Sequence, residues 1–166
     1  MHTKVDEIKK ICIICSKSGI EDVYSALILA NGAVMEGMEA NLFFTFFGLD
    51  AITKKRMKKL KTPSVGNPSL RFLNGMPFPS FLGFLPGVEA LISGSIHRRL
   101  EKKGIPGTEE FLQMITAGGG KLYACKLAME LFDLKKEDLS DEISGILTVG
   151  EFYEQCAGER TQIIYI

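Results

Sequence analysis

The architecture of this chain is clearest in one stretch, Gly118-Gly-Gly-Lys-Leu-Tyr-Ala-Cys125-Lys-Leu-Ala-Met-Glu-Leu-Phe-Asp133. Three glycines precede a short apolar run that ends in cysteine, and an amphipathic segment follows. This order predicts a loop, a strand and a helix, with Cys125 where the strand meets the helix. Backbone N–H groups and the positive end of the helix dipole favour an anion at such a junction. Cys125 is therefore placed to be a thiolate, although a buried residue that fills the strand end is an equal alternative.

The residues around Cys125 fit the thiolate interpretation. Lys121 and Lys126 add positive charge, and cations and helix N-termini both stabilise thiolates. Gly119 and Gly120 belong to the glycine triplet and would let the backbone approach a sulfur donor. The triplet is not a phosphate-binding loop, because it precedes a strand and lacks the G-x-x-x-x-G-K-[ST] pattern.

The rest of the chain alternates between apolar runs and helical patterns. Ile11-Cys-Ile-Ile-Cys15 and Asn41-Leu-Phe-Phe-Thr-Phe-Phe47 are continuous apolar runs, as in strands buried on both faces of a parallel sheet. Between them, a capping box from Ser18 to Glu21 predicts a helix that ends near Gly37. Further helices are expected over 50–61, 89–103, 108–117 and 150–158, with strands over 146–149 and 161–166. This alternation predicts a three-layer α/β sandwich with a mostly parallel sheet.

Composition limits the function classes. The 166 residues (46% hydrophobic, 24% charged) predict a single domain, 1–166, with a substantial core. The formal net charge is zero, so nothing global favours nucleic acid as a partner. One basic run, Lys54-Lys-Arg-Met-Lys-Lys-Leu-Lys61, has no interleaved aromatic residues. A solvated helix face is favoured there over an anion-binding patch.

The four cysteines do not form a dense disulfide framework, and no secretory signal opens the chain. We therefore expect a cytoplasmic protein with reduced thiols. The two histidines, His2 and His97, are too few and too scattered for a metal site, and neither a metal nor another cofactor is expected. His97 is interpreted as a surface residue.

Cys12-Ile-Ile-Cys15 has the C-x-x-C spacing of a redox pair but lies in a predicted strand, where positions three apart face opposite sides. Cys12 is expected in the core, and Cys156 is also interpreted as structural. Cys15 ends its strand, and ligands of open α/β sheets bind beyond the carboxyl ends of strands. It is a candidate second thiol if its strand neighbours that of Cys125, with core packing as the favoured alternative.

Residues 62–88 form an apolar insertion rich in proline and glycine, and no charged residue occurs between Phe72 and Val88. The segment is too short and too broken for a membrane-spanning helix, which needs roughly 20 mostly apolar residues. A loop packed over the site or against a neighbouring subunit is favoured. Peripheral membrane contact is the alternative.

Three segments together resemble the DsrE-like (DsrE/DsrF/DsrH-like) family of sulfur-trafficking proteins, in the branch once labelled peroxiredoxin-like. They are Ala30-Asn-Gly-Ala-Val-Met-Glu-Gly-Met-Glu-Ala-Asn-Leu-Phe-Phe-Thr-Phe-Phe-Gly-Leu49, Leu85-Pro-Gly-Val-Glu-Ala-Leu91 and Leu122-Tyr-Ala-Cys-Lys-Leu-Ala-Met-Glu-Leu131. The resemblance implies a five-stranded parallel sheet, a homo-oligomer, and a persulfide or thiosulfonate on Cys125. It also implies sulfur-donor and sulfur-acceptor partners of rhodanese-like or TusA-like type. Lys126, where relatives often have a neutral polar residue, favours an anionic donor such as thiosulfate or a polythionate.

The sequence therefore predicts a sulfur carrier or sulfurtransferase, acting as a stoichiometric carrier, that holds a sulfane sulfur on Cys125 and passes it to a protein thiol. The alternative is a noncatalytic oligomeric binding or scaffold protein whose apolar loop docks a partner or a membrane. A thiol peroxidase is disfavoured, because no peroxide-binding surround is recognisable around a cysteine.

Overall fold

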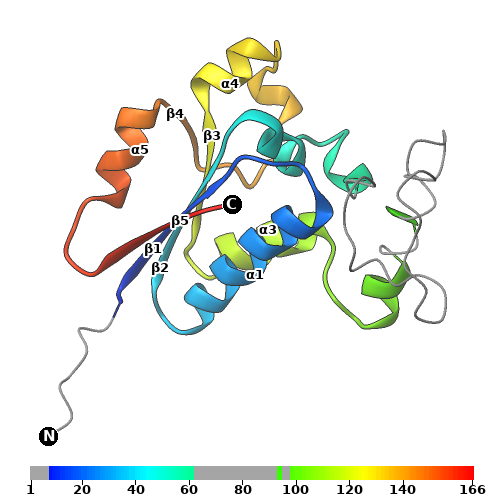
Figure 1. The fold of residues 1–166 in the computed structure, drawn as a ribbon, viewed down its shortest axis with the longest axis horizontal. Coiled ribbons are helices and arrows are strands. Elements are labelled where there is room, and N and C mark those ends of the chain that lie inside the picture. The colour runs from blue at the N-terminus through cyan, green and yellow to red at the C-terminus, as the bar shows by residue number, and fades with distance from the viewer. Residues whose placement is uncertain (1–7, 62–92, 95–97) are drawn as a thin grey trace, which may run out of the picture.

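The fold is a parallel β-sheet with helices on both faces. The computed structural model describes residues 8–61, 93–94 and 98–166. Five parallel strands have the order β4-β3-β2-β1-β5, which confirms the predicted α/β class (Figure 1). The strands are β1 (Lys10–Cys15), β2 (Glu39–Phe44), β3 (Lys121–Cys125), β4 (Gly145–Leu147) and β5 (Thr161–Tyr165). The helices are α1 (Ile20–Met35), α3 (Thr108–Ala117), α4 (Lys126–Leu131) and α5 (Val149–Cys156), with 3-10 segments η1 (Phe46–Ile52), η2 (Met57–Lys59) and η4 (Lys136–Asp138).

The register assigns each strand residue to one face of the sheet. Cys15 is level with Phe44, and Phe44 with Ala124, so these three side chains share one face. Their chain neighbours point to the opposite face, which α5 covers, whereas α1 and α3 lie together on the other side (Figure 1). Burial on both sides explains why β1, β2 and β3 are continuous apolar runs.

An aromatic cluster packs α5 against the sheet. Phe152 is fully buried and stacks on Phe43, with ring centroids 4.5 Å apart and an interplanar angle of 14°. Tyr123 contacts the same ring edge-on, at 6.4 Å. Offset and edge-to-face pairs of this kind add to the free energy gained from burying the rings.

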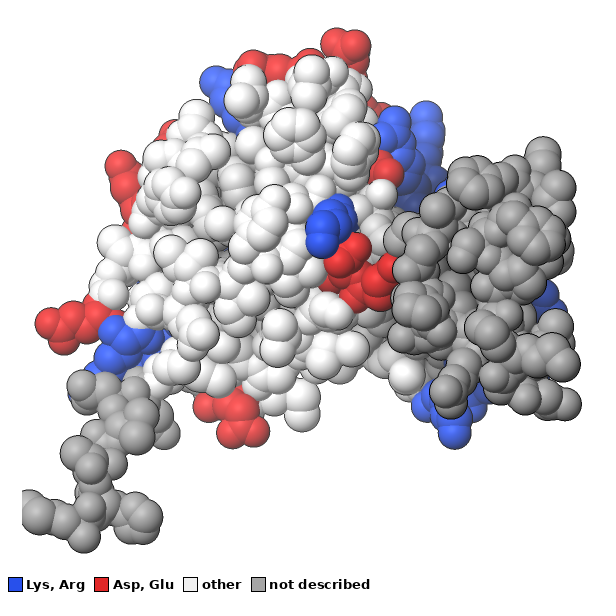
Figure 2. Space-filling model, in the orientation of Figure 1, with Lys and Arg blue, Asp and Glu red and all other residues white. Residues whose placement is uncertain are grey.

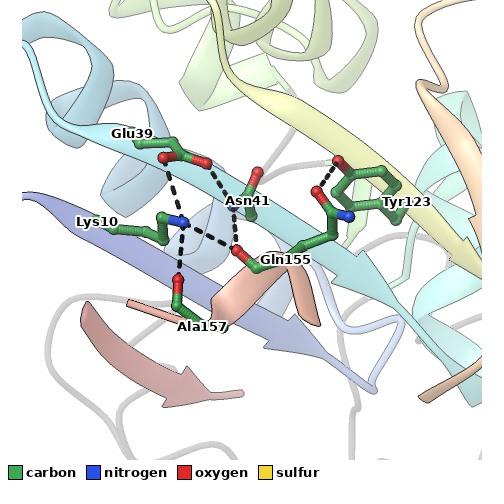
Figure 3. A network of polar contacts seen from close by, with 6 residues as sticks. All are labelled: Lys10, Glu39, Asn41, Tyr123, Gln155 and Ala157. Carbon is green, nitrogen blue, oxygen red and sulfur yellow. Dashed lines mark hydrogen bonds and ion pairs between the residues drawn. The ribbon is translucent and has the colours of Figure 1, made fainter. Parts of the chain in front are cut away.

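A polar network fixes the carboxyl end of α5 (Figure 3). Lys10 Nζ donates hydrogen bonds to the carbonyl oxygens of Gln155 (3.1 Å) and Ala157 (3.2 Å), and it lies 3.4 Å from Glu39 Oε2. Asn41 Nδ2 donates to the Gln155 carbonyl at 3.3 Å. The last carbonyl groups of a helix have no partner within the helix, so these bonds satisfy acceptors that would otherwise need water.

The second predicted strand and the helix predicted over 50–61 are partly wrong. β2 ends at Phe44, and the chain then turns through η1 and η2, which are 3-10 segments. Phe46 has a φ of 46°, which ends the extended backbone. Gly48 then packs so closely on β1 that a Cβ there would lie 2.1 Å from the Cys15 carbonyl oxygen. Gly48 itself lies in the 3-10 segment η1, so the chain here is a tight turn and not an extended strand.

The basic run is not a simple solvated helix face either. Lys54 pairs with Asp141 at 2.7 Å, Arg56 with Asp50 at 2.8 Å, and Lys58 with Glu109 at 2.9 Å. These pairs tie the run to three separate parts of the fold. They are exposed to varying degrees, so each contributes little stability by itself.

One predicted helix start is also wrong. Gly19, not Ser18, is the N-cap of α1, and no side chain caps this helix. The Lys61 carbonyl accepts a hydrogen bond from Ile20 N at 3.1 Å, which removes the need for a side-chain cap. The helix expected over 108–117 is α3, with the same bounds, and Gly107 is its N-cap.

Some predictions lie outside the described residues: His2, His97 and the apolar insertion at 62–88. In the part of the chain that is described, no helix has both the length and the apolar character needed to cross a bilayer.

Candidate functional site

Cys125 lies where the sequence places it, at the junction of a strand and a helix. It is the last residue of β3 and the N-cap of α4. This position belongs to the carboxyl edge of the sheet, where α4 rises above β3 (Figure 1). Ligands of open parallel sheets bind at this edge. The Cys125 side chain makes no capping hydrogen bond, so its sulfur is not committed to the first turn of α4.

The Cys125 thiol is nearly enclosed, with 3% of the residue exposed. Large exposed side chains nevertheless lie on the two elements next to it: Phe46 and Phe47 on η1, and Leu127 and Leu131 on α4. We call these four residues the apolar rim. The elements are joined by Phe47 and Phe132, whose ring centroids are 5.7 Å apart. A reagent therefore has little direct access to Cys125, and the exposed surface of the neighbouring α4 and η1 is largely apolar.

Lys126 is the predicted supporting residue that stays beside Cys125. It is the exposed first residue of α4 and is close enough to α5 to affect Glu151. Hydrogen bonds from the backbone N–H and the hydroxyl of Thr148 lower the pKa of Glu151, and the charge of Lys126 adds a smaller contribution. The starts of α4 and α5 thus lie near one another at the carboxyl edge.

The other predicted supporting residues lie at the opposite end of β3. Lys121 begins the strand, about 13 Å from Cys125 at the usual rise per residue. Gly119 has a φ of 93°, which favours glycine, and a Cβ on Gly120 would lie 2.5 Å from Ile115 Cγ2. These glycines have a packing role in the turn from α3 to β3, and the structure does not bring them to Cys125.

Cys15 and Cys125 share the carboxyl edge but do not lie on neighbouring strands. The strand β2 lies between β1 and β3, so the condition under which Cys15 would be a second thiol is not met. Cys15 is also level with Ala124, so the two sulfurs point to opposite faces of the sheet. Cys15 Sγ lies 3.6 Å from the Lys17 carbonyl oxygen, and burial raises the pKa of its thiol to about 11.

Cys12 lies in β1 beneath α5, and Cys156 is the last residue of α5. Burial raises the pKa of both thiols, that of Cys156 to about 12. All four cysteines are free. Within the described residues, no group of three or more His, Cys, Asp or Glu side chains is arranged to hold a metal ion.

The apolar rim is the part of the site that the sequence did not reveal. Phe46 and Phe47 end the run predicted as a buried strand, and Leu127 and Leu131 lie in the predicted amphipathic helix. In the structure β2 ends at Phe44, α4 has six residues, and all four side chains are exposed. A local sequence signal for either feature is lacking.

Comparison with known proteins identifies the family. A model of the DsrE/DsrF/DrsH-like family matches residues 7–164. The chain is similar to sulfur carrier protein DsrE2 of Allochromatium vinosum, with 32% identity over 164 residues, covering 96% of this chain and 99% of the relative. It is also 24% identical to YrkE of Bacillus subtilis, over 83% of this chain and 86% of that protein.

A solved structure supports the same fold. The YchN protein of Escherichia coli superposes with a TM-score of 0.54 at 13% identity, covering 95% of this chain and 99% of that one. At this identity the likeness concerns the fold alone. The family match spans nearly the whole chain. The chain therefore belongs to the DsrE/DsrF/DrsH-like family.

Proposed function

We propose that this protein is a sulfur carrier that holds a sulfane sulfur covalently on Cys125 and passes it to a thiol of another protein. The observation that carries the proposal is the similarity, over nearly the full length of both chains, to a protein named a sulfur carrier. This similarity supports a role in sulfur trafficking. The position of Cys125 at the carboxyl edge, between β3 and the α4 helix that carries part of the apolar rim, supports the choice of this residue.

The chemistry has two steps. The Cys125 thiolate attacks the outer sulfur of thiosulfate, the S–S bond of the donor breaks, sulfite leaves with the electron pair, and Cys125 becomes a persulfide. In the second step a partner thiolate attacks the terminal sulfur of the protonated persulfide. The partner gains that sulfur, and Cys125 leaves as a thiolate. No external oxidant or reductant is needed, because each step exchanges one sulfur–sulfur bond for another.

The enclosure of Cys125 has a consequence for this chemistry. A persulfide beneath the apolar rim would be shielded from water and from small thiols, which protects the cargo between the two steps. Loading and unloading would then require α4, which has six residues, to move away from η1. Because Lys126 is the first residue of α4, its charge would accompany this movement and favour an anionic donor.

The proposal also covers the partner proteins, the oligomeric state and the cellular location. Sulfur-transfer proteins of rhodanese-like or TusA-like type are the expected donors and acceptors, and the chain is expected to form a homo-oligomer. We also propose a cytoplasmic location, where the four free thiols would stay reduced. Gly119, Gly120, Lys121 and Cys15 are not given a direct role, because the structure does not place them against Cys125.

The experiment is intact-protein mass spectrometry after incubation with thiosulfate, tetrathionate or polysulfide. Wild type and a matched Cys156→Ala control should gain about 32 Da for each sulfane sulfur added by polysulfide. Cys125→Ala should gain nothing. No mass gain on wild type, or the same gain on Cys125→Ala, would rule out the carrier function.

The scaffold alternative rests on residues 62–88, which lie outside the described residues, so it stays a prediction. Liposome flotation separates the two functions. Flotation that is lost when 72–88 is deleted, in a protein whose cellular role survives Cys125→Ala, would favour the scaffold.

A further inference from the structure

Among the described strands, β5 forms one edge of the sheet, and no strand pairs with its outer side. β5 pairs with β1 and is the last strand in the order (Figure 1). Ile166 N donates to the Ile14 carbonyl at 2.8 Å, and the Ile166 carbonyl accepts from Ser16 N at 2.9 Å. Backbone groups alternate in direction along a parallel strand, so those of Thr161, Ile163 and Tyr165 point away from β1.

Two large side chains on the α5 side of this edge are exposed. Ile163 is 51% exposed and Tyr165 is 70% exposed. Ile163 is level with Cys12 and Tyr165 with Ile14, so both point to the side of the sheet that carries α5. Tyr153 on α5 is also exposed. Figure 2, in the orientation of Figure 1, shows almost no charged residue on the surface over β5.

The opposite edge of the sheet is protected in the ways that natural proteins use. β4 has three residues, and the pocket beside it is lined by Lys54, Lys136, Glu137 and Asp141. Short edge strands and nearby charges prevent pairing with another chain. β5 has five residues, none of them charged, and is rich in β-branched and aromatic side chains. An edge of this composition is suited to pairing rather than to exposure.

We propose that β5 pairs in antiparallel fashion with β5 of a second copy of this chain, about a twofold axis at Ile163, so that two five-stranded sheets join into one. Ile163 then lies opposite the partner's Ile163, and Thr161 lies opposite the partner's Tyr165. All of these residues have outward-pointing backbone groups, so each N–H meets a C=O.

The absence of charge identifies the occupant as a second copy. A twofold interface apposes a surface to itself, so a charged patch would repel its own image, whereas a neutral apolar edge is complementary to itself. The three exposed side chains, two of them tyrosines, offer roughly 300 Å² per copy, given the size of aromatic residues. The two copies together bury roughly 600 Å² through these side chains and further area along the backbone edge, which places the interface in the small, transient class below about 1,200 Å² in total. We therefore expect dissociation in the micromolar range.

The test uses opposite charges on the proposed axis. Ile163→Lys and Ile163→Glu each place two like charges directly opposite one another, and each should weaken self-association about a hundredfold. An equimolar mixture of the two variants should associate again, because the mixed pair is attractive. Sedimentation velocity measures the three samples and wild type. Met35→Lys, an exposed apolar site on α1, is the matched control and should sediment like wild type.

The outcomes separate this interface from other contacts between copies. If Ile163→Lys keeps the mass of wild type, or if the mixture stays dissociated, β5 is not the interface. Circular dichroism of each variant verifies folding, and the exposed position of Ile163 makes unfolding unexpected. The inference does not depend on sulfur chemistry, because the Ile163→Lys variant should still gain a persulfide on Cys125.

Discussion

Lys10 holds α5 on the sheet through its ammonium group. A substitution can remove this charge and keep the aliphatic part of the side chain. In Lys10→Met the chain keeps an apolar side chain of similar length, and the carbonyl groups of Gln155 and Ala157 lose their donor (Figure 3). The Lys10 side chain is 19% exposed, whereas that of Glu39 is 42% exposed. The ion pair with Glu39 is therefore screened and contributes little. The two hydrogen bonds carry the effect.

The size of the loss follows from the burial of those bonds. A hydrogen bond from a charged donor contributes about 1.5–3 kcal/mol when it is shielded. The bond to Gln155 is partly buried and the bond to Ala157 is exposed, so only the first counts in full. We expect Lys10→Met to lower the free energy of unfolding by about 2–3 kcal/mol. For a chain of this length the melting temperature should fall by about 5–10 °C.

Urea denaturation and thermal melting of Lys10→Met, beside Lys9→Met as the exposed neighbouring control, measure this loss. Hydrogen exchange of α5 should accelerate in Lys10→Met and not in Lys9→Met. If the two substitutions cost the same, the network does not hold α5, and the aromatic cluster around Phe152 carries the attachment alone.

Three further predictions concern packing and protonation. Phe152→Ala should lower the free energy of unfolding by about 3–5 kcal/mol, since it empties a fully buried site between Phe43 and Tyr123; a cost below about 1 kcal/mol in urea titrations would refute this. Gly48→Ala should cost about 3 kcal/mol or more, because its Cβ would meet the Cys15 carbonyl oxygen, whereas Gly32→Ala in α1 meets nothing within 4 Å and should stabilise by about 0.5–1 kcal/mol; equal melting temperatures for the two variants would contradict the close approach. Burial raises the pKa of Cys15 from 9.0 to about 11, so the folded state keeps this proton longer, and the resulting stability is complete below pH 9 and lost towards pH 11. Between pH 7 and pH 10 wild type should lose about 1.4 kcal/mol more than Cys15→Ala, and parallel pH profiles would exclude this linkage.

The strands could be predicted from the sequence because burial on both faces leaves a continuous apolar run. β1 and β3 lie within one residue of their predicted positions, and Cys125 is at the expected junction. The end of β2 could not be predicted in this way. Phe46 and Phe47 extend the apolar run, and only the contact between Gly48 and the Cys15 carbonyl, distant in sequence, shows that the strand has already ended.

The predicted cap of α1 was wrong, and the condition for Cys15 to be a second thiol was not met, for a similar reason. Ser18 matches a capping box, but the Lys61 carbonyl, more than forty residues away, serves the start of α1 instead. Cys15 would neighbour Cys125 only if β1 and β3 were adjacent, and strand order is a property of the whole sheet. Local patterns predict elements well, whereas contacts between distant segments decide where they end and which residues meet.

The measurement that tests the central proposal most directly is the location of a bound sulfane sulfur. Wild-type protein is incubated with polysulfide, its persulfides are trapped with an alkylating reagent, and its peptides are analysed by mass spectrometry. The sulfur-carrier proposal predicts one additional sulfur on the peptide that contains Cys125, and its loss when a thiol acceptor is added. Additional sulfur on the peptides of Cys15 or Cys156 alone, or on none, would contradict it.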